Sequence, residues 1–104
     1  MKLLTVHFKK PVDWEGIPYI HFWPTAEHGA FSNWPGELMQ ADEDGWFVFR
    51  FEASSANFVF NDGHGQQTGD YYRDREGWLD DDGRWYNSLP TASERAAVKK
   101  MWPT

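Results

Sequence analysis

The 104-residue sequence predicts an all-β fold, an antiparallel β-sandwich, for most of its length. Two observations support this fold class. Apolar residues recur with period two in several short windows, which is typical of strands with one buried face. Clusters of Gly, Pro, Asn and Asp separate these windows at intervals of roughly 8–12 residues, as expected for a sandwich of short strands joined by turns.

The strand pattern is clearest in four windows, and a further strand begins late in the chain. The expected strands cover residues 3–8, 19–23, 46–51 and 57–61, and the last begins at 85–86. Turn-forming residues fill the intervals 24–36, 42–45, 54–55, 61–63 and 80–83. This alternation of short strands and turns is what predicts the antiparallel sandwich.

The end of the chain has a different pattern. Residues 91–94 fit a capping box. In this motif a Thr hydroxyl accepts a hydrogen bond from the backbone amide three residues later, and the Glu side chain at that position accepts one from the Thr amide. Helix-favouring residues follow, which predicts a short helix over 93–101. We therefore expect one domain over residues 1–90 and a short C-terminal helix or linker over 91–104.

Charge and composition exclude several classes of function. The formal net charge is −6 and the ten Lys and Arg residues form no stripe, so a nucleic-acid partner is not expected. The absence of cysteine excludes a disulfide scaffold and a thiolate metal site. No apolar run approaches the ~20 residues that span a bilayer. The four His residues lack the spacing of a zinc site. We expect no cofactor and no membrane partner.

A catalytic role is not expected either. Glycoside hydrolysis needs two carboxylates placed across a cleft, and a small sandwich offers no deep cleft. The serines lie in no nucleophile-elbow setting. The acidic run at 80–82 could bind calcium, which prefers several oxygen ligands, although an acidic turn is usually only solvated.

Aromatic content is the unusual feature of the composition. Phe, Tyr and Trp make up 18% of the chain, which holds seven Trp residues. A chain of this size buries only about two-thirds of its surface on folding. Several of these rings should therefore stay partly in water, and exposed large rings usually serve recognition.

The strand predicted at 19–23 presents two different faces. Ile20 and Phe22 should face the core, which turns His21 and Trp23 outward. A surface of flat rings with polar edges suits a sugar, whose C–H faces stack on aromatic rings and whose hydroxyls need hydrogen bonds. The alternatives are that Trp23 packs under the following loop and that His21 is simply solvated.

Four further candidates lie in predicted loops. Trp34 precedes Pro35-Gly36, and its position fits a loop anchor and a ligand platform equally well. Trp78 precedes an acidic run, a setting too polar for an interior ring, which favours an exposed platform. Gln67 and Asp70 follow a turn and are candidate hydrogen-bond partners for a ligand, with a plain surface role as the alternative.

A series of short motifs runs along most of the chain in a characteristic order. They are Val6-His7-Phe8-Lys9-Lys10, Trp14, Tyr19-Ile20-His21-Phe22-Trp23, Trp34-Pro35-Gly36 with Met39, Gly45-Trp46-Phe47-Val48-Phe49, Asn57-Phe58-Val59-Phe60-Asn61-Asp62-Gly63, and Gln67-Thr68-Gly69-Asp70. The later run Gly77-Trp78-Leu79-Asp80-Asp81-Asp82-Gly83 resembles the Trp-Asp-Asn-Asn turn of carbohydrate-binding family 25. Together, over about residues 4–87, they resemble the starch-binding modules of families 25 and 26.

The resemblance implies a fold, a ligand and a set of contacts. The fold would be an immunoglobulin-like β-sandwich, and the ligand an α-1,4-linked glucan such as starch, glycogen or a maltooligosaccharide. Such modules are not catalytic and are usually attached to amylases, so a linked glycoside hydrolase domain is the implied partner. The family 25 contacts fall on His21, Trp34 and Trp78. In family 26, an aromatic residue of the early strand, here Trp23 or His21, pairs with Trp34.

The main alternative is an immunoglobulin-like protein-interaction domain that uses the exposed aromatic residues. A protein hot spot favours aliphatic neighbours around its rings, whereas a sugar platform favours polar ones. The neighbours here include Ser32, Asn33 and Asp80, which favours the sugar. The compartment is left open: extracellular if the module comes from a secreted amylase, cytoplasmic if Met1 is native.

Overall fold

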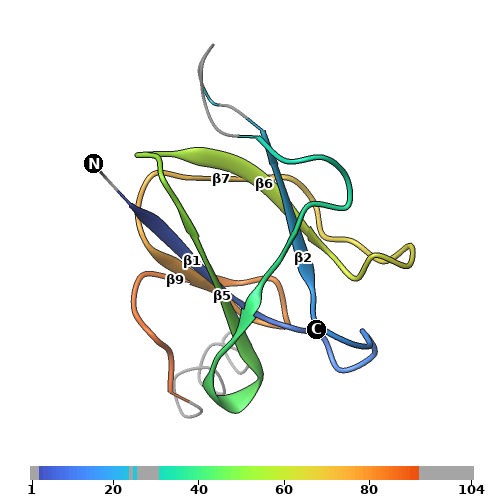
Figure 1. Ribbon diagram of the computed structural model, residues 1–104. Coiled ribbons are helices and arrows are strands. Elements are labelled where there is room, and N and C mark those ends of the chain that lie inside the picture. The colour runs from blue at the N-terminus through green and yellow to red at the C-terminus, as the bar shows by residue number, and fades with distance from the viewer. Residues whose placement is uncertain (1–2, 24, 26–30, 92–104) are drawn as a thin grey trace.

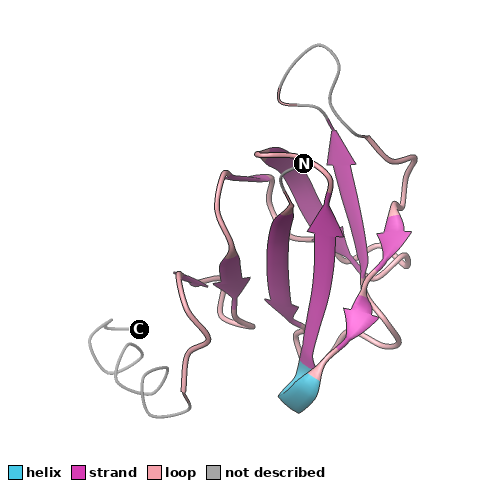
Figure 2. Ribbon diagram, turned by 60° about the vertical axis from the view of Figure 1, so that its left-hand side comes forward, coloured by secondary structure: helices cyan, strands magenta, loops and turns pink. Residues whose placement is uncertain are grey.

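The computed structural model describes residues 3–23, 25 and 31–91, and these form two β-sheets packed face to face (Figure 1, Figure 2). One sheet has five strands in the order β4-β5-β1-β8-β9, and the other has four in the order β3-β2-β6-β7. The strands are β1 (Leu4–Lys9), β2 (Tyr19–Trp23), β3 (Glu37–Leu38), β4 (Gln40–Ala41), β5 (Trp46–Phe51), β6 (Ala56–Asn61), β7 (Tyr71–Arg73), β8 (Gly77–Leu79) and β9 (Trp85–Tyr86).

The all-β sandwich predicted from the sequence is confirmed. The strands at 19–23 and 46–51 have the predicted bounds, those at 4–9 and 56–61 differ by one residue, and the last strand begins at Trp85 as predicted. The sequence pattern missed β3, β4, β7 and β8, because strands of two or three residues are too short for an alternation to be recognised.

The prediction of a wholly antiparallel sandwich needs one correction. Strands β1 and β8 pair in parallel, with Val6 opposite Gly77 and Phe8 opposite Leu79. The chain crosses from β7 in the four-stranded sheet to β8 in the five-stranded sheet, so β8 does not enter its sheet through a hairpin. Only strands joined by a tight hairpin must run antiparallel, and this crossover removes that constraint.

The core between the sheets consists mainly of aromatic rings. Phe8 of β1 and Phe60 of β6 stack across the interface with ring centroids 4.2 Å apart and an interplanar angle of 4°. Phe58 lies beside Phe60 in an edge-to-face contact, and neither ring is exposed to solvent. These ring contacts fill the core of a chain that has few aliphatic residues.

The helix predicted at 93–101 lies outside the described residues. Within residues 3–23, 25 and 31–91, the helical element that the structure defines is the 3-10 turn η1 (Glu43–Gly45) before β5. In that described part of the chain, no helix has the length and apolar character needed to cross a membrane.

Candidate functional site

The outer face of the four-stranded sheet carries the predicted aromatic residues of β2. Ile20 is fully buried and Phe22 is 7% exposed, so both lie in the core. Successive side chains of a strand point to opposite faces, so His21 and Trp23 point away from the core, where both are partly exposed. The alternation therefore predicted the two faces of this strand correctly.

The loop before β3 places Trp34 beside this face. The loop runs along β2, since the Ser32 amide donates to the Phe22 carbonyl at 2.9 Å and the Phe22 amide donates to Ser32 Oγ at 3.0 Å. Gly36 has a φ of 108°, and a Cβ at this position would lie 2.1 Å from the Ile20 carbonyl oxygen. Only glycine allows this close approach of the loop to the strand.

Asn61 fixes the same loop from the neighbouring strand β6. Its side chain is 1% exposed, and Nδ2 donates to the Pro35 carbonyl at 2.9 Å. Its Oδ1 accepts from the Gly63 amide, also at 2.9 Å. One buried amide thus joins the Trp34 loop to the turn that follows β6.

The three aromatic side chains form a cluster of tilted rings, which we call the platform (His21, Trp23 and Trp34). The His21 and Trp34 ring centroids lie 5.3 Å apart at 70°, and those of His21 and Trp23 lie 5.8 Å apart at 38°. Trp34 is 55% exposed. His21 is oriented by a 2.9 Å hydrogen bond between Nδ1 and Ser32 Oγ. The platform therefore offers ring faces at an angle to one another rather than a flat strip.

Asn61→Ala should destabilise the fold and release the Trp34 loop. The substitution removes the two hydrogen bonds that the buried Asn61 side chain makes to the Pro35 carbonyl and the Gly63 amide, each worth about 0.5–1.5 kcal/mol. We expect a loss of about 1–3 kcal/mol in the free energy of unfolding, measured by urea denaturation. Asn87→Ala removes one exposed acceptor and is the matched control, with an expected cost below about 1 kcal/mol. Equal losses in the two variants would contradict this role of Asn61.

The predicted polar contacts Gln67 and Asp70 lie on the loop between β6 and β7. Both are exposed, and the backbone of Gln67 forms an isolated antiparallel β-bridge with Asn61 at the end of β6. No hydrogen bond in the described part of the chain joins either residue to the platform. The structure therefore places them beside the four-stranded sheet without bringing them into contact with the rings.

Asp62 organises the turn before that loop. Its Oδ1 accepts from the amides of His64 at 2.7 Å and Gln66 at 3.0 Å. Burial raises the pKa of Asp62, but these hydrogen bonds outweigh it, so the pKa lies below its usual value of 3.8. Because the folded-state pKa is depressed, the ionised carboxylate contributes stability above the usual pKa. That contribution is lost as the pH falls through the folded-state value.

The stability contributed by the Asp62 charge should decrease as the pH is lowered. Asp62→Asn keeps one acceptor oxygen and removes the charge. We expect wild type to melt at a higher temperature than Asp62→Asn near neutral pH, and the difference should shrink below about pH 4. Thermal melts from neutral to acidic pH measure it. A difference that stays constant over the whole range would show that the charge contributes nothing.

Trp78 is not part of the platform, which corrects the grouping of His21, Trp34 and Trp78 in one site. Trp78 lies in β8 of the five-stranded sheet, not in a turn, and its ring stacks on His7 with centroids 4.3 Å apart at 2°. The next residue, Leu79, points into the core, so Trp78 points outward from the opposite side of the sandwich. It borders a cavity of about 470 Å³ that Trp46 and Leu89 also line.

The acidic run at 80–82 forms a tight turn. Asp80 is 2% exposed, and its Oδ1 accepts from the amides of Asp82 at 2.9 Å and Arg84 at 3.0 Å. Tyr86 donates its hydroxyl proton to the other oxygen at 3.2 Å. The three carboxylates lie close enough to reach one ion. Because both Asp80 oxygens already accept hydrogen bonds within and beside the turn, this residue has a structural role.

Comparison with known families identifies the chain. The family described as starch-binding module 26 matches residues 6–73. The chain belongs to this family. The match agrees with the resemblance noted in the sequence and with the expectation of a non-catalytic carbohydrate-binding protein. Comparison with curated protein sequences gave no match.

Solved structures support the same assignment for this family 26 module. The family 26 module of a Bacillus halodurans amylase in complex with maltose is 29% identical, with a TM-score of 0.74 over 84% of this chain and 99% of the other. A family 25 module of a Paenibacillus polymyxa β/α-amylase shares the fold, with 24% identity and a TM-score of 0.68 over 86% and 95%. A family 26 structure from Eubacterium rectale Amy13K with maltoheptaose also shares the fold, with 22% identity and a TM-score of 0.66 over 85% and 50%.

Two residues that place the platform of this starch-binding module were missed by the sequence reasoning. Ser32 and Asn61 are ordinary polar residues in a loop and at a strand end, and no local pattern assigns either of them to the site. The one available signal was the Asn-Asp-Gly turn beginning at Asn61, which indicates a side chain hydrogen-bonded to nearby backbone.

Proposed function

We propose that this module binds α-1,4-linked glucans, including starch, glycogen and maltooligosaccharides, on the outer face of the four-stranded sheet. The observation that carries the proposal is the tilted arrangement of His21, Trp23 and Trp34. Amylose is a wide helix, so a binder that follows its curve needs rings set at an angle. The neighbouring family 26 structure in complex with maltose is consistent with this ligand class.

Each side chain of the platform has a distinct proposed role. Trp34 and Trp23 stack on the apolar faces of glucose residues. His21 lies between them and presents Nε2 to a hydroxyl, since its Nδ1 is engaged by Ser32. Gln67 and Asp70 are proposed as hydrogen-bond partners that reach the rim of a bound chain. Sugars suit such a site because each residue has both C–H faces and hydroxyl edges.

The proposed affinity is modest. Each stacked sugar face buries roughly 50–80 Å² of apolar area, worth about 1–2 kcal/mol. Two or three such contacts, less the cost of association, correspond to dissociation constants of roughly micromolar to millimolar. The proposed biological role is to hold a linked glycoside hydrolase on polysaccharide, where weak binding still permits movement along the polymer.

Two finer structural expectations belong to this proposal. We propose the immunoglobulin-like type of sandwich, which the likeness to the family 25 and 26 modules supports. We also propose residues 1–90 as the folding unit, with 91–104 as a helix or linker leading away from it. The contact with Trp78 that family 25 implies would require a second area on the opposite face of the sandwich.

Affinity electrophoresis in gels with and without soluble starch or glycogen tests the function. Wild type should be retarded by either glucan. It should migrate normally in gels that contain dextran or a soluble cellulose derivative, which have other linkages. Equal migration in all gels would overturn glucan binding, and the exposed rings would then be assigned to a protein interface.

A further inference from the structure

The outer face of the four-stranded sheet holds one more exposed ring, on β7 at its edge. Tyr72 is 56% exposed. Its neighbour Tyr71 packs against the core, with ring centroids 6.2 Å from Phe58 and 5.3 Å from Trp85. Because side chains alternate along a strand, Tyr72 points to the same outer face as the platform.

The strand register places Tyr72 in line with the platform. Trp23 of β2 lies opposite Asn57 of β6, and Asn57 lies opposite Tyr72 of β7. Neighbouring strands lie about 4.8 Å apart, so Tyr72 is about 10 Å from Trp23 across the sheet. On the other side of β2, the hydrogen-bonded loop carries Trp34. A strip of side chains therefore runs from Trp34 through His21 to Trp23, and continues across Asn57 to Tyr72.

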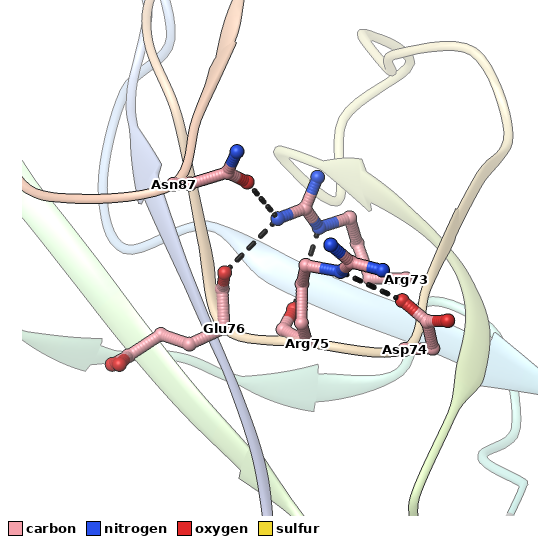
Figure 3. Close-up of polar contacts among 5 residues, drawn as sticks. All are labelled: Arg73, Asp74, Arg75, Glu76 and Asn87. Atoms are coloured by element: carbon pink, nitrogen blue, oxygen red, sulfur yellow. Dashed lines mark hydrogen bonds and ion pairs between the residues drawn. The ribbon is translucent and has the colours of Figure 1, made fainter.

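The strand that carries Tyr72 is held firmly at its end. The Arg73 guanidinium donates to the Glu76 carbonyl at 2.9 Å and to Asn87 Oδ1 at 3.0 Å (Figure 3). It also lies over the Trp85 ring, 4.8 Å from its centroid. These contacts join the end of β7 to the five-stranded sheet, so the position of Tyr72 is fixed before any ligand binds, which lowers the ordering cost of a contact there.

We propose that Tyr72 forms an outer subsite that binds additional glucose residues of a longer α-glucan. The inference rests on the proposed function of the platform. The phenol ring offers a flat face for stacking and a hydroxyl for hydrogen bonding, and the partly buried Asn57 places a polar side chain between Trp23 and Tyr72. A short oligosaccharide occupies the platform alone, whereas a longer one continues across β6 to Tyr72. The subsite therefore makes the module prefer long chains.

Isothermal titration of maltotriose and maltoheptaose into four proteins tests the subsite. Tyr72→Ala should weaken maltoheptaose binding by about fivefold and leave maltotriose binding unchanged. Tyr72→Phe keeps the ring and should stay within about twofold of wild type for both sugars. Leu3→Ala, which removes a side chain of similar exposure from outside the platform and outside the cavity beside Trp78, should match wild type. Thermal melts check that each variant is folded.

The outcomes separate this inference from the function on which it rests. Wild type that binds neither sugar overturns the proposed function and the subsite with it. Wild type that binds both, with Tyr72→Ala indistinguishable for maltoheptaose, overturns the subsite alone. An equal loss for both sugars in Tyr72→Ala also overturns the outer position, because it would place Tyr72 within the platform.

Discussion

Trp34→Ala should weaken binding of maltoheptaose by about tenfold or more and abolish retardation in starch gels. Trp34 is the most exposed member of the platform and meets His21 edge to face. Losing the burial of a large ring against ligand costs about 1.5–3 kcal/mol, which is a factor of roughly 10–100 in the dissociation constant. The same exposure means that the free energy of unfolding should change by less than about 1 kcal/mol.

Two further variants make this result specific. Trp34→Phe keeps a smaller ring and should retain part of the affinity. Leu3→Ala removes a side chain of similar fractional exposure outside the platform and should bind like wild type. Unchanged affinity in a folded Trp34→Ala protein would exclude the platform as the binding site. Loss of affinity together with a large fall in melting temperature would instead assign Trp34 a packing role.

Phe60→Ala should have the largest effect on stability, about 3–5 kcal/mol. Phe60 is not exposed and stacks on Phe8 of the opposite sheet, so its removal opens a cavity between the two sheets. For a domain of this size the melting temperature should fall by roughly 12–40 °C. Because small domains are stable by only about 5–15 kcal/mol, this loss is a large fraction of the total.

A matched substitution on the surface controls for the loss of a phenylalanine as such. Phe31 is 68% exposed, so Phe31→Ala should change the free energy of unfolding by less than about 0.5 kcal/mol. Both variants are measured by thermal and urea denaturation. A cost for Phe60→Ala below about 1.5 kcal/mol would mean that the core closes over the missing ring, and that the stacked pair is not what joins the sheets.

Local patterns predicted the elements whose information lies within a few neighbouring residues. The alternation in β2 predicted that Ile20 and Phe22 face the core and that His21 and Trp23 face outward, and the burial agrees. This works because side chains of a strand alternate strictly, so one clear apolar face determines the other. Short strands such as β3 and β7 have no such alternation and were missed for that reason.

The grouping of the site was decided by contacts between residues far apart in the sequence. Trp34 meets His21 because Asn61 and Ser32 hold its loop against β2, and a single sequence contains no record of these hydrogen bonds. The family 25 resemblance grouped Trp78 with Trp34, yet the parallel pairing of β8 with β1 places Trp78 on the other side of the sandwich.

The sequence by itself determined which residue types are available for recognition and which face of a long strand they occupy. The tertiary structure alone decided which of them share a surface. Trp34 contacts His21, which contacts Trp23. Tyr72 lies in register with Trp23 across β6, whereas Trp78 lies on the other side of the sandwich. The physical reason is that sheet order and register are set by the packing of the whole core. The same local pattern is therefore compatible with either face of the sandwich.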